Sequence, residues 1–75
     1  MNNRLKELRS ARSWTQEHTA EKLAVTRQTV IALEKGRSFP SLELAFRIAE
    51  LFDRRVEEVF DPLGDGLEPL DSTTE

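Results

Sequence analysis

Apolar residues recur at steps of three and four positions through most of the first 60 residues, which is the spacing of one face of an α-helix. Short polar or proline-containing segments separate the stretches that have this spacing. The pattern predicts an all-α fold with five helices, over residues 3–12, 15–23, 27–35, 42–52 and 56–60.

Short polar side chains stand at the predicted helix starts. Asn3, Thr15, Thr26 and Ser41 each precede a helix and can accept a hydrogen bond from a backbone N–H group of its first turn. Gly36 readily takes the positive φ with which helices commonly end. The third helix is therefore expected to begin after Thr26 and to end at Gly36.

The predicted helix at 42–52 has a continuous apolar stripe. Its core-facing residues are expected to be Leu42, Ala45, Ile48, Ala49 and Phe52. Leu44 and Phe46 fall outside this stripe, so they either cover other parts of the body or belong to a dimer surface.

The two faces of the predicted helix at 27–35 differ in chemistry. Val30 and Leu33 point to one side, where they can hold the helix against a core. The other side carries Gln28, Ile31, Ala32 and Lys35. An amide, a methyl-rich surface and a cation on a protruding helix are the groups that a helix-turn-helix presents to the major groove of DNA.

The chain resembles the phage repressor and Cro-like helix-turn-helix family, known as the XRE type, over roughly residues 3–60, which is most of the chain. The resemblance rests on Thr15-Gln16 at one helix start, Thr26-Arg27-Gln28-Thr29-Val30 at the next, and Glu34-Lys35-Gly36 at its end. It implies a compact five-helix bundle of the lambda-repressor-like DNA-binding type over residues 1–60, with double-stranded DNA as the partner.

The resemblance also implies roles for single residues. The expected base-reading residues are Gln28, Arg27, Thr29, Ile31 and Ala32, and the expected phosphate contacts are Gln16, Thr26, Lys35, Arg37 and Ser38. Gln28 is the leading reader, because glutamine can hold the N6/N7 edge of adenine, whereas Arg27 suits guanine or phosphate almost equally. Ile31 either meets a thymine methyl group or is partly buried against a neighbour. Arg9 and Glu34 are expected to form an ion pair between the first and third helices.

Several positions depart from the family's pattern. Glycine is common in the family where this chain has Ser13, Ala24 and Asp53. Keeping a left-handed backbone at Ser13 or Ala24 costs about 1–2 kcal/mol each, unless those corners have changed shape. Thr19 replaces a large aliphatic residue, and if it is buried its hydroxyl must bond to a backbone carbonyl. Trp14 is expected at the core or its edge.

Charge is distributed unevenly along the chain. The formal net charge of −3 over 75 residues at first argues against a nucleic-acid partner. However, residues 1–60 hold 11 Lys and Arg against 9 acids, whereas residues 61–75 hold 5 acids and no base. The body is mildly basic, and residues 61–75 are expected to form a flexible acidic tail, or an arm that packs on a partner or screens the basic face.

Composition narrows the other function classes. Cysteine is absent and histidine occurs once, so disulfides and the usual zinc sites are excluded, and we expect no metal, cofactor or small-molecule ligand. No apolar run approaches the length needed to span a bilayer, and no signal sequence begins the chain. We therefore expect a cytoplasmic protein without a membrane partner, associated with the nucleoid when it is bound to DNA. An enzyme is not expected, since no nucleophile–base pair or cofactor motif is present.

Two functions fit the sequence. The first is a sequence-specific transcriptional regulator, expected to be a homodimeric repressor that reads a palindromic operator. The alternative is an antitoxin-like or adaptor module that uses the same fold and its acidic tail to engage a protein.

Overall fold

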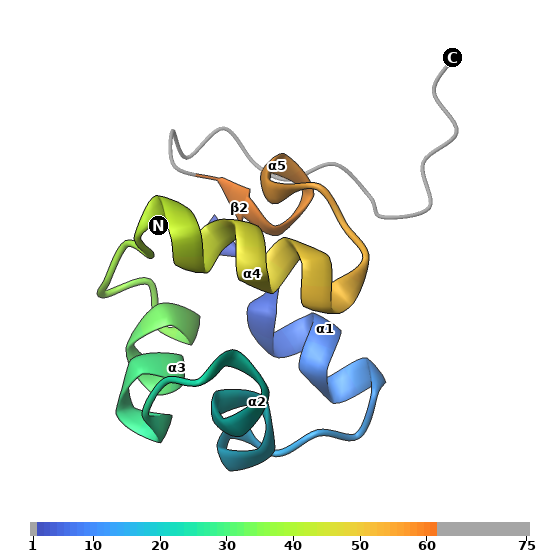
Figure 1. Ribbon diagram of the computed structural model, residues 1–75, viewed down its shortest axis with the longest axis vertical. Coiled ribbons are helices and arrows are strands. Elements are labelled where there is room, and N and C mark those ends of the chain that lie inside the picture. Colours follow the sequence, from blue (N-terminus) through green and yellow to red (C-terminus); the bar gives the residue numbers. More distant parts are fainter. Residues whose placement is uncertain (1, 62–75) are drawn as a thin grey trace.

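The computed structural model describes residues 2–61; Met1 and residues 62–75, which include most of the expected acidic tail, lie outside the described residues. The helices are α1 (Leu5–Ala11), α2 (Gln16–Leu23), α3 (Arg27–Glu34), α4 (Leu42–Phe52) and α5 (Val56–Val59) (Figure 1). Two short strands, β1 (Asn2–Asn3) and β2 (Phe60–Asp61), flank them. The predicted helical architecture is confirmed.

Hydroxyl caps begin three of the helices. Thr15, Thr26 and Ser41 each accept a hydrogen bond from the backbone N–H three residues later, at 2.9, 3.1 and 3.1 Å. All three caps were predicted from the sequence and are confirmed. Because one such cap contributes about 1 kcal/mol, these residues stabilise the starts of α2, α3 and α4 appreciably.

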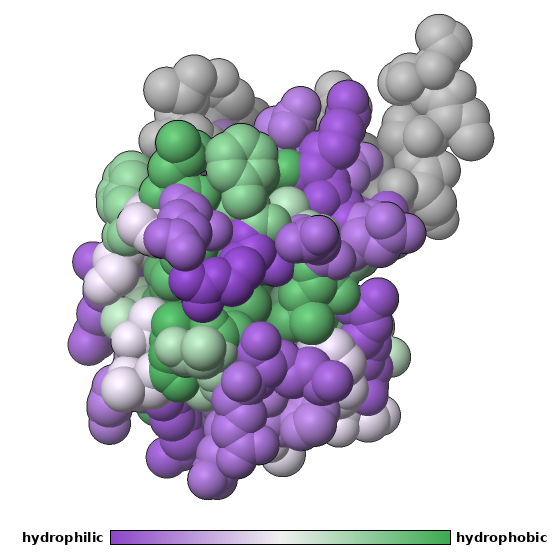
Figure 2. Space-filling view, viewed as in Figure 1, coloured by the Kyte–Doolittle hydropathy of each residue, from purple (hydrophilic) through white to green (hydrophobic). Residues whose placement is uncertain are grey.

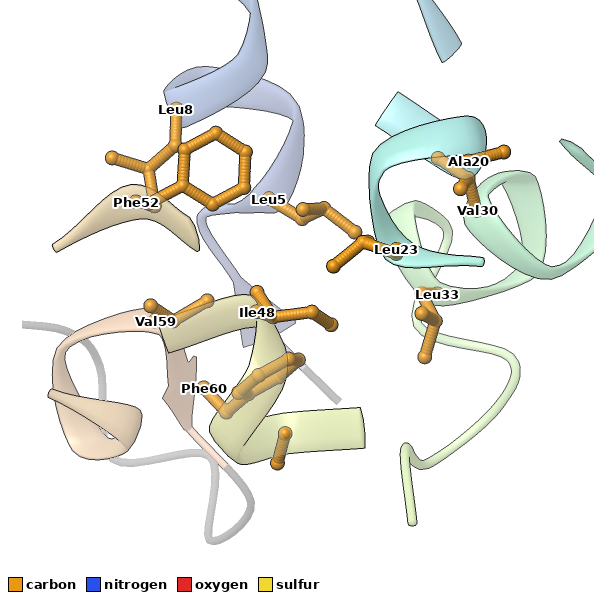
Figure 3. Close-up of a cluster of buried hydrophobic side chains, with 11 residues drawn as sticks. Leu5, Leu8, Ala20, Leu23, Val30, Leu33, Ile48, Phe52, Val59 and Phe60 are labelled. Carbon is orange, nitrogen blue, oxygen red and sulfur yellow. The ribbon is translucent and has the colours of Figure 1, made fainter. Parts of the chain in front are cut away.

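Every helix contributes to one apolar core. The side chains in it that are at most 2% exposed include Leu5, Leu23, Val30, Leu33, Ile48, Phe52 and Val59 (Figure 3). Thr19 is also fully buried, and its hydroxyl donates to the Thr15 carbonyl at 2.9 Å, as the sequence required. Trp14 packs at the edge of this core.

The predicted stripe on α4 is wrong at Leu42, whereas Leu44 meets the first of its two predicted alternatives, that of covering another part of the body. Leu42, expected in the core, is 72% exposed, whereas Leu44 is half-buried and packs against the core. These residues lie on opposite edges of the stripe, and the neighbouring helices cover only the edge that carries Leu44. Phe46 is 59% exposed, so its outward placement is confirmed.

A two-stranded sheet replaces the outer ends of two predicted helices. Asn2 pairs with Asp61 and Asn3 with Phe60, in antiparallel register. The last helix therefore ends at Val59, one residue earlier than predicted, because Phe60 takes extended dihedral angles of −117° and 141°. Asp61, the first residue of the expected tail, is buried in this strand.

Asn3 was expected to cap the first helix, but that helix begins only at Leu5. The Asn3 side chain accepts from the Leu5 N–H at 3.0 Å and donates through Nδ2 to the Leu33 carbonyl at 2.7 Å. The start of the described chain is thereby attached to the end of α3.

Three corners keep a left-handed backbone without glycine. The φ angles are 60° at Ser13, 59° at Ala24 and 55° at Asp53. Each residue follows the end of a helix, where such a conformation lets its backbone or that of the next residue bond to the helix carbonyls. The alternative that these corners had changed shape is therefore excluded.

Candidate nucleic-acid interface

The α2–α3 pair forms a tight corner. Leu23 ends α2, Ala24 takes the left-handed conformation, and the Val25 N–H donates back to the Ala20 carbonyl at 3.0 Å. Thr26 then caps α3. The left-handed Ala24, a bend at Val25 and the extended Thr26 thus turn the chain from one helix into the next.

One side of α3 is buried and the other is open. Val30 and Leu33 are 0% and 1% exposed and hold the helix on the core. Arg27 and Gln28, in its first turn, are exposed. Figure 1 shows α3 at the margin of the molecule, and the side chains of Arg27 and Gln28 lie on its uncovered side.

The remaining proposed base readers are less exposed. Thr29, Ile31 and Ala32 are half-buried. The Thr29 hydroxyl lies 2.9 Å from that of Thr26, which also accepts the Thr29 N–H, so both hydroxyls are engaged at the cap. Gln28 and Arg27 are therefore the side chains most available at this end of α3.

A bidentate ion pair holds the other end of α3. Arg9 donates through Nε to Glu34 Oε2 and through Nη2 to Glu34 Oε1, the latter at 3.1 Å. The two side chains are only 13% and 5% exposed, and Arg9 Nη1 also reaches the Trp14 carbonyl. The hydrogen bond to Glu34 raises the pKa of Arg9, against the opposing effect of burial. The pair predicted from the resemblance is present and ties α1 to α3.

The side chain of Gln16, which was expected to contact a phosphate, bonds to another residue of the protein instead. Its Nε2 donates to Glu34 Oε1 at 3.1 Å, so the amide belongs to the Arg9–Glu34 network. Among the first backbone N–H groups of α2, that of His18 donates to the Thr15 cap at 2.9 Å, whereas those of Gln16 and Glu17 point out of the helix start, at the positive end of its dipole. A phosphate contact at this end of α2 therefore stays a prediction, and the Gln16 amide is held by Glu34.

Cations surround the open side of α3. Lys35 stands just after the helix, and Arg37 and Ser38 lie in the loop that follows; all three are exposed. Within residues 2–61, neither Arg27, Lys35 nor Arg37 forms an ion pair, so their charges are not neutralised by the described part of the protein. This arrangement suits a polyanion better than a neutral ligand.

The family model described as helix-turn-helix matches residues 5–59. The chain belongs to the helix-turn-helix family of transcriptional regulators. An uncharacterized HTH-type transcriptional regulator of Methanocaldococcus jannaschii is 52% identical over 60 residues, covering 80% of this chain and 91% of that protein. The uncharacterized HTH-type transcriptional regulator YgzD of Bacillus subtilis is 48% identical over 60 residues, which again cover 80% of this chain and 91% of that protein. A further such regulator, from Methanothermobacter thermautotrophicus, is 51% identical over 61 residues, covering 80% of this chain and 88% of the relative.

Two polar contacts that position the helix-turn-helix were missed by the sequence reasoning. One is the Asn3 bond to the Leu33 carbonyl described above. The other comes from α4, where Arg47 Nη1 donates to the Leu23 carbonyl at 2.6 Å while Nη2 bonds to Glu43 at 3.2 Å. Both are long-range bonds to backbone carbonyls, and a residue type alone does not reveal which carbonyl it will reach.

Two structural features were searched for among the described residues. Between residues 2 and 61, no helix is long and apolar enough to cross a bilayer. In the same range, no group of three or more acidic or histidine side chains is placed to hold a metal ion.

Proposed function

We infer that this helix-turn-helix protein binds double-stranded DNA as a homodimer, inserts the first turn of α3 into the major groove, and represses transcription from a palindromic operator. The observation that carries the proposal is the contrast on α3, where buried Val30 and Leu33 oppose exposed Arg27 and Gln28. Such a helix is held firmly while its polar first turn stays accessible to base edges.

The proposed roles divide between selection and positioning. Gln28 reads adenine, and Arg27 holds guanine or a neighbouring phosphate. Thr29, Ile31 and Ala32 lie deeper on α3 and supply methyl groups and shape against the groove. Thr26, Lys35, Arg37 and Ser38, with the first turn of α2 at Gln16, contact phosphates and set the orientation of the protein.

A homodimer supplies what one subunit lacks. A single α3 offers few exposed readers, so one subunit alone binds weakly and distinguishes few base pairs. Two copies related by a twofold axis read two half-sites about 34 Å apart, which is one turn of DNA. Repression requires only that this dimer occupies DNA needed by the transcription machinery.

Selection from random-sequence duplex DNA tests this function. We expect a palindrome with half-sites about 10 base pairs apart, and a binding constant that falls steeply with salt as counterions are released. Reporter expression from a promoter that overlaps the selected site should fall when the protein is present. Recovery of no sequence, together with salt-independent binding, would contradict the proposal.

The competing function is a protein-interaction module. It is favoured by the exposure of Phe39, Leu42 and Phe46, at 68%, 72% and 59%, since large apolar side chains on a surface often meet a protein. Under this alternative DNA binding is secondary or absent, so the selection should enrich no operator. The selection experiment therefore separates the two functions.

A further inference from the structure

The segment that leads from the end of α3 into α4 exposes side chains of two kinds. Lys35 and Arg37 are exposed cations that form no ion pair within residues 2–61. Phe39 and Leu42, which follow them, are large apolar side chains that are 68% and 72% exposed. Figure 2 shows hydrophobic surface gathered over α4, with hydrophilic side chains beside it. We refer to these four residues as the loop face, which offers both positive charge and apolar surface to an occupant.

The last described residues lie beside the loop face. Phe60 in β2 pairs with Asn3, whose side chain donates through Nδ2 to the Leu33 carbonyl at 2.7 Å. The same carbonyl accepts the backbone N–H of Gly36 at 3.0 Å, so the sheet and the start of the loop meet at one oxygen atom. The chain therefore continues beyond β2 from a point close to the loop face.

The sequence beyond β2 is complementary to the loop face in charge and in polarity. Residues 62–75 contain acids and leucines but no Lys, Arg or His. The acids are Asp65, Glu68, Asp71 and Glu75, and the leucines are Leu63, Leu67 and Leu70. Since one residue spans at most about 3.3–3.6 Å, this segment is long enough to cross the loop face, which comprises only residues 35–42.

We propose that residues 62–75 cover the loop face of their own chain. Their leucines pack on Phe39 and Leu42, and their carboxylates lie beside Lys35 and Arg37. Because the segment is covalently attached next to this surface, its effective concentration there is high and weak individual contacts suffice. A single occupant thus accounts for both the unpaired cations and the exposed apolar side chains.

This contact makes the acidic tail an autoinhibitory element. Lys35 and Arg37 are proposed phosphate contacts, so DNA must displace the carboxylates before its phosphates reach these cations. The tail therefore lowers the affinity for every DNA sequence. This role rests on the proposed function, whereas the contact itself does not and is measured without DNA.

A spin label in the tail tests the contact. The chain has no cysteine, so Ser72→Cys in the full chain gives a nitroxide a single attachment site. We expect the amide NMR signals of residues 35–42 to lose most of their intensity relative to the chemically reduced sample. The signals of α2, at the opposite end of the molecule from β2 in Figure 1, should change little. Because charge pairs contribute to the contact, about 0.5 M salt should weaken the broadening.

Variants of the labelled chain separate the two kinds of contact. One variant neutralises the acids (Asp65→Asn, Glu68→Gln, Asp71→Asn and Glu75→Gln), and another removes two leucines (Leu67→Ser and Leu70→Ser). Each should lose most of the broadening at residues 35–42. Thr73→Ser, which alters neither an acid nor a leucine, is the matched control and should keep it.

Three results would overturn the contact. The first is equal broadening of all exposed amides, and the second is broadening that neither tail variant reduces. The third comes from mixing spin-labelled chains without ¹⁵N with ¹⁵N-labelled chains that carry no spin label. Broadening of residues 35–42 in that mixture would assign the tail to the loop face of a second copy.

Binding to random duplex DNA tests the autoinhibitory role. The variant with neutralised acids should bind about 10-fold more tightly than the wild type at low salt. Addition of duplex to the spin-labelled wild type should restore the signals of residues 35–42. Broadening that persists while DNA is bound would overturn autoinhibition. A protein that binds no DNA would contradict the proposed function and the autoinhibitory role together, while the spin label would still decide the contact.

Discussion

The two ends of α3 are built in opposite ways. At its C-terminal end, Glu34 is almost fully buried and accepts hydrogen bonds from Arg9 and Gln16, while Asn3 bonds to the neighbouring Leu33 carbonyl. At its N-terminal end, the side chain of Gln28 is exposed, and within residues 2–61 the polar side-chain bonds of the first turn are those of the Thr26 cap.

This difference separates support from recognition. The polar groups at the C-terminal end are satisfied by residues distant in the sequence, so they set the orientation of the helix. The side chains at the N-terminal end are left to meet a ligand. Substitutions at the two ends should therefore alter different quantities, namely the free energy of unfolding and the selectivity for DNA.

The largest expected effect is at the supported end. Glu34→Gln keeps the shape of the side chain but removes the charge opposite Arg9, leaving a largely buried cation unpaired. We expect the free energy of unfolding to fall by about 3–5 kcal/mol, measured by urea denaturation. Glu21→Gln, on the exposed side of α2, is the matched control and should change it little. Equal, small losses for both variants would show that the ion pair does not hold α3.

A smaller effect of opposite sign is expected at the corner that leads into α3. Ala24 has a φ of 59°, which a residue with a Cβ atom adopts at a cost. Ala24→Gly should raise the free energy of unfolding by about 1 kcal/mol, since relief of strain exceeds the added entropy of the unfolded chain. Asp53→Gly should give a smaller gain, because aspartate tolerates this conformation better. Destabilisation by Ala24→Gly would mean that the corner carries no strain.

Removal of the cap at the open end of α3 should change the free energy of unfolding by a comparable amount, but in the destabilising direction. Thr26→Ala removes the acceptor of the Thr29 N–H and should lower the free energy of unfolding by about 1 kcal/mol. Thr15→Ala removes the equivalent cap of α2 and should cost a similar amount. The Thr26 variant is expected to weaken operator binding more than the Thr15 variant does, because the first turn of α3 reads bases whereas that of α2 contacts a phosphate. Identical binding losses would indicate that the start of α3 is no closer to DNA than that of α2.

The smallest effect is expected in the loop after α3. Arg37 is exposed and unpaired within residues 2–61, and we assign it to a phosphate. Arg37→Ala should weaken binding to all DNA sequences alike and reduce the log–log salt slope by about 1. Filter binding at several salt concentrations measures this change. A selective loss on one operator would instead make Arg37 a base reader.

The sequence predicted the features that depend on local chemistry. Thr15, Thr26 and Ser41 are caps because their hydroxyls reach N–H groups three residues away. Thr19 bonds to the Thr15 carbonyl for the same local reason. The helix periods identified most of the core, and the resemblance identified the Arg9–Glu34 pair, which periodicity alone does not reveal.

The features that were missed depend on contacts between distant segments. The β1–β2 pairing joins the two ends of the described chain through two residues each, too few to show strand alternation. The exposure of Leu42 depends on which edge of α4 its neighbours cover. The Gln16 amide turned to Glu34 because a buried carboxylate attracts a nearby donor. The DNA-contact roles themselves stay predictions.

The most direct test compares the wild type with Gln28→Ala on the selected operator, on its single-base variants and on random duplex. If the first turn of α3 reads the sequence, the Ala variant should lose about 1–3 kcal/mol of discrimination at one position of each half-site. Its affinity for random duplex and its unfolding free energy should be nearly unchanged. Equal weakening on every DNA sequence would make Gln28 a positioning residue and would contradict the assignment of recognition to this end of α3.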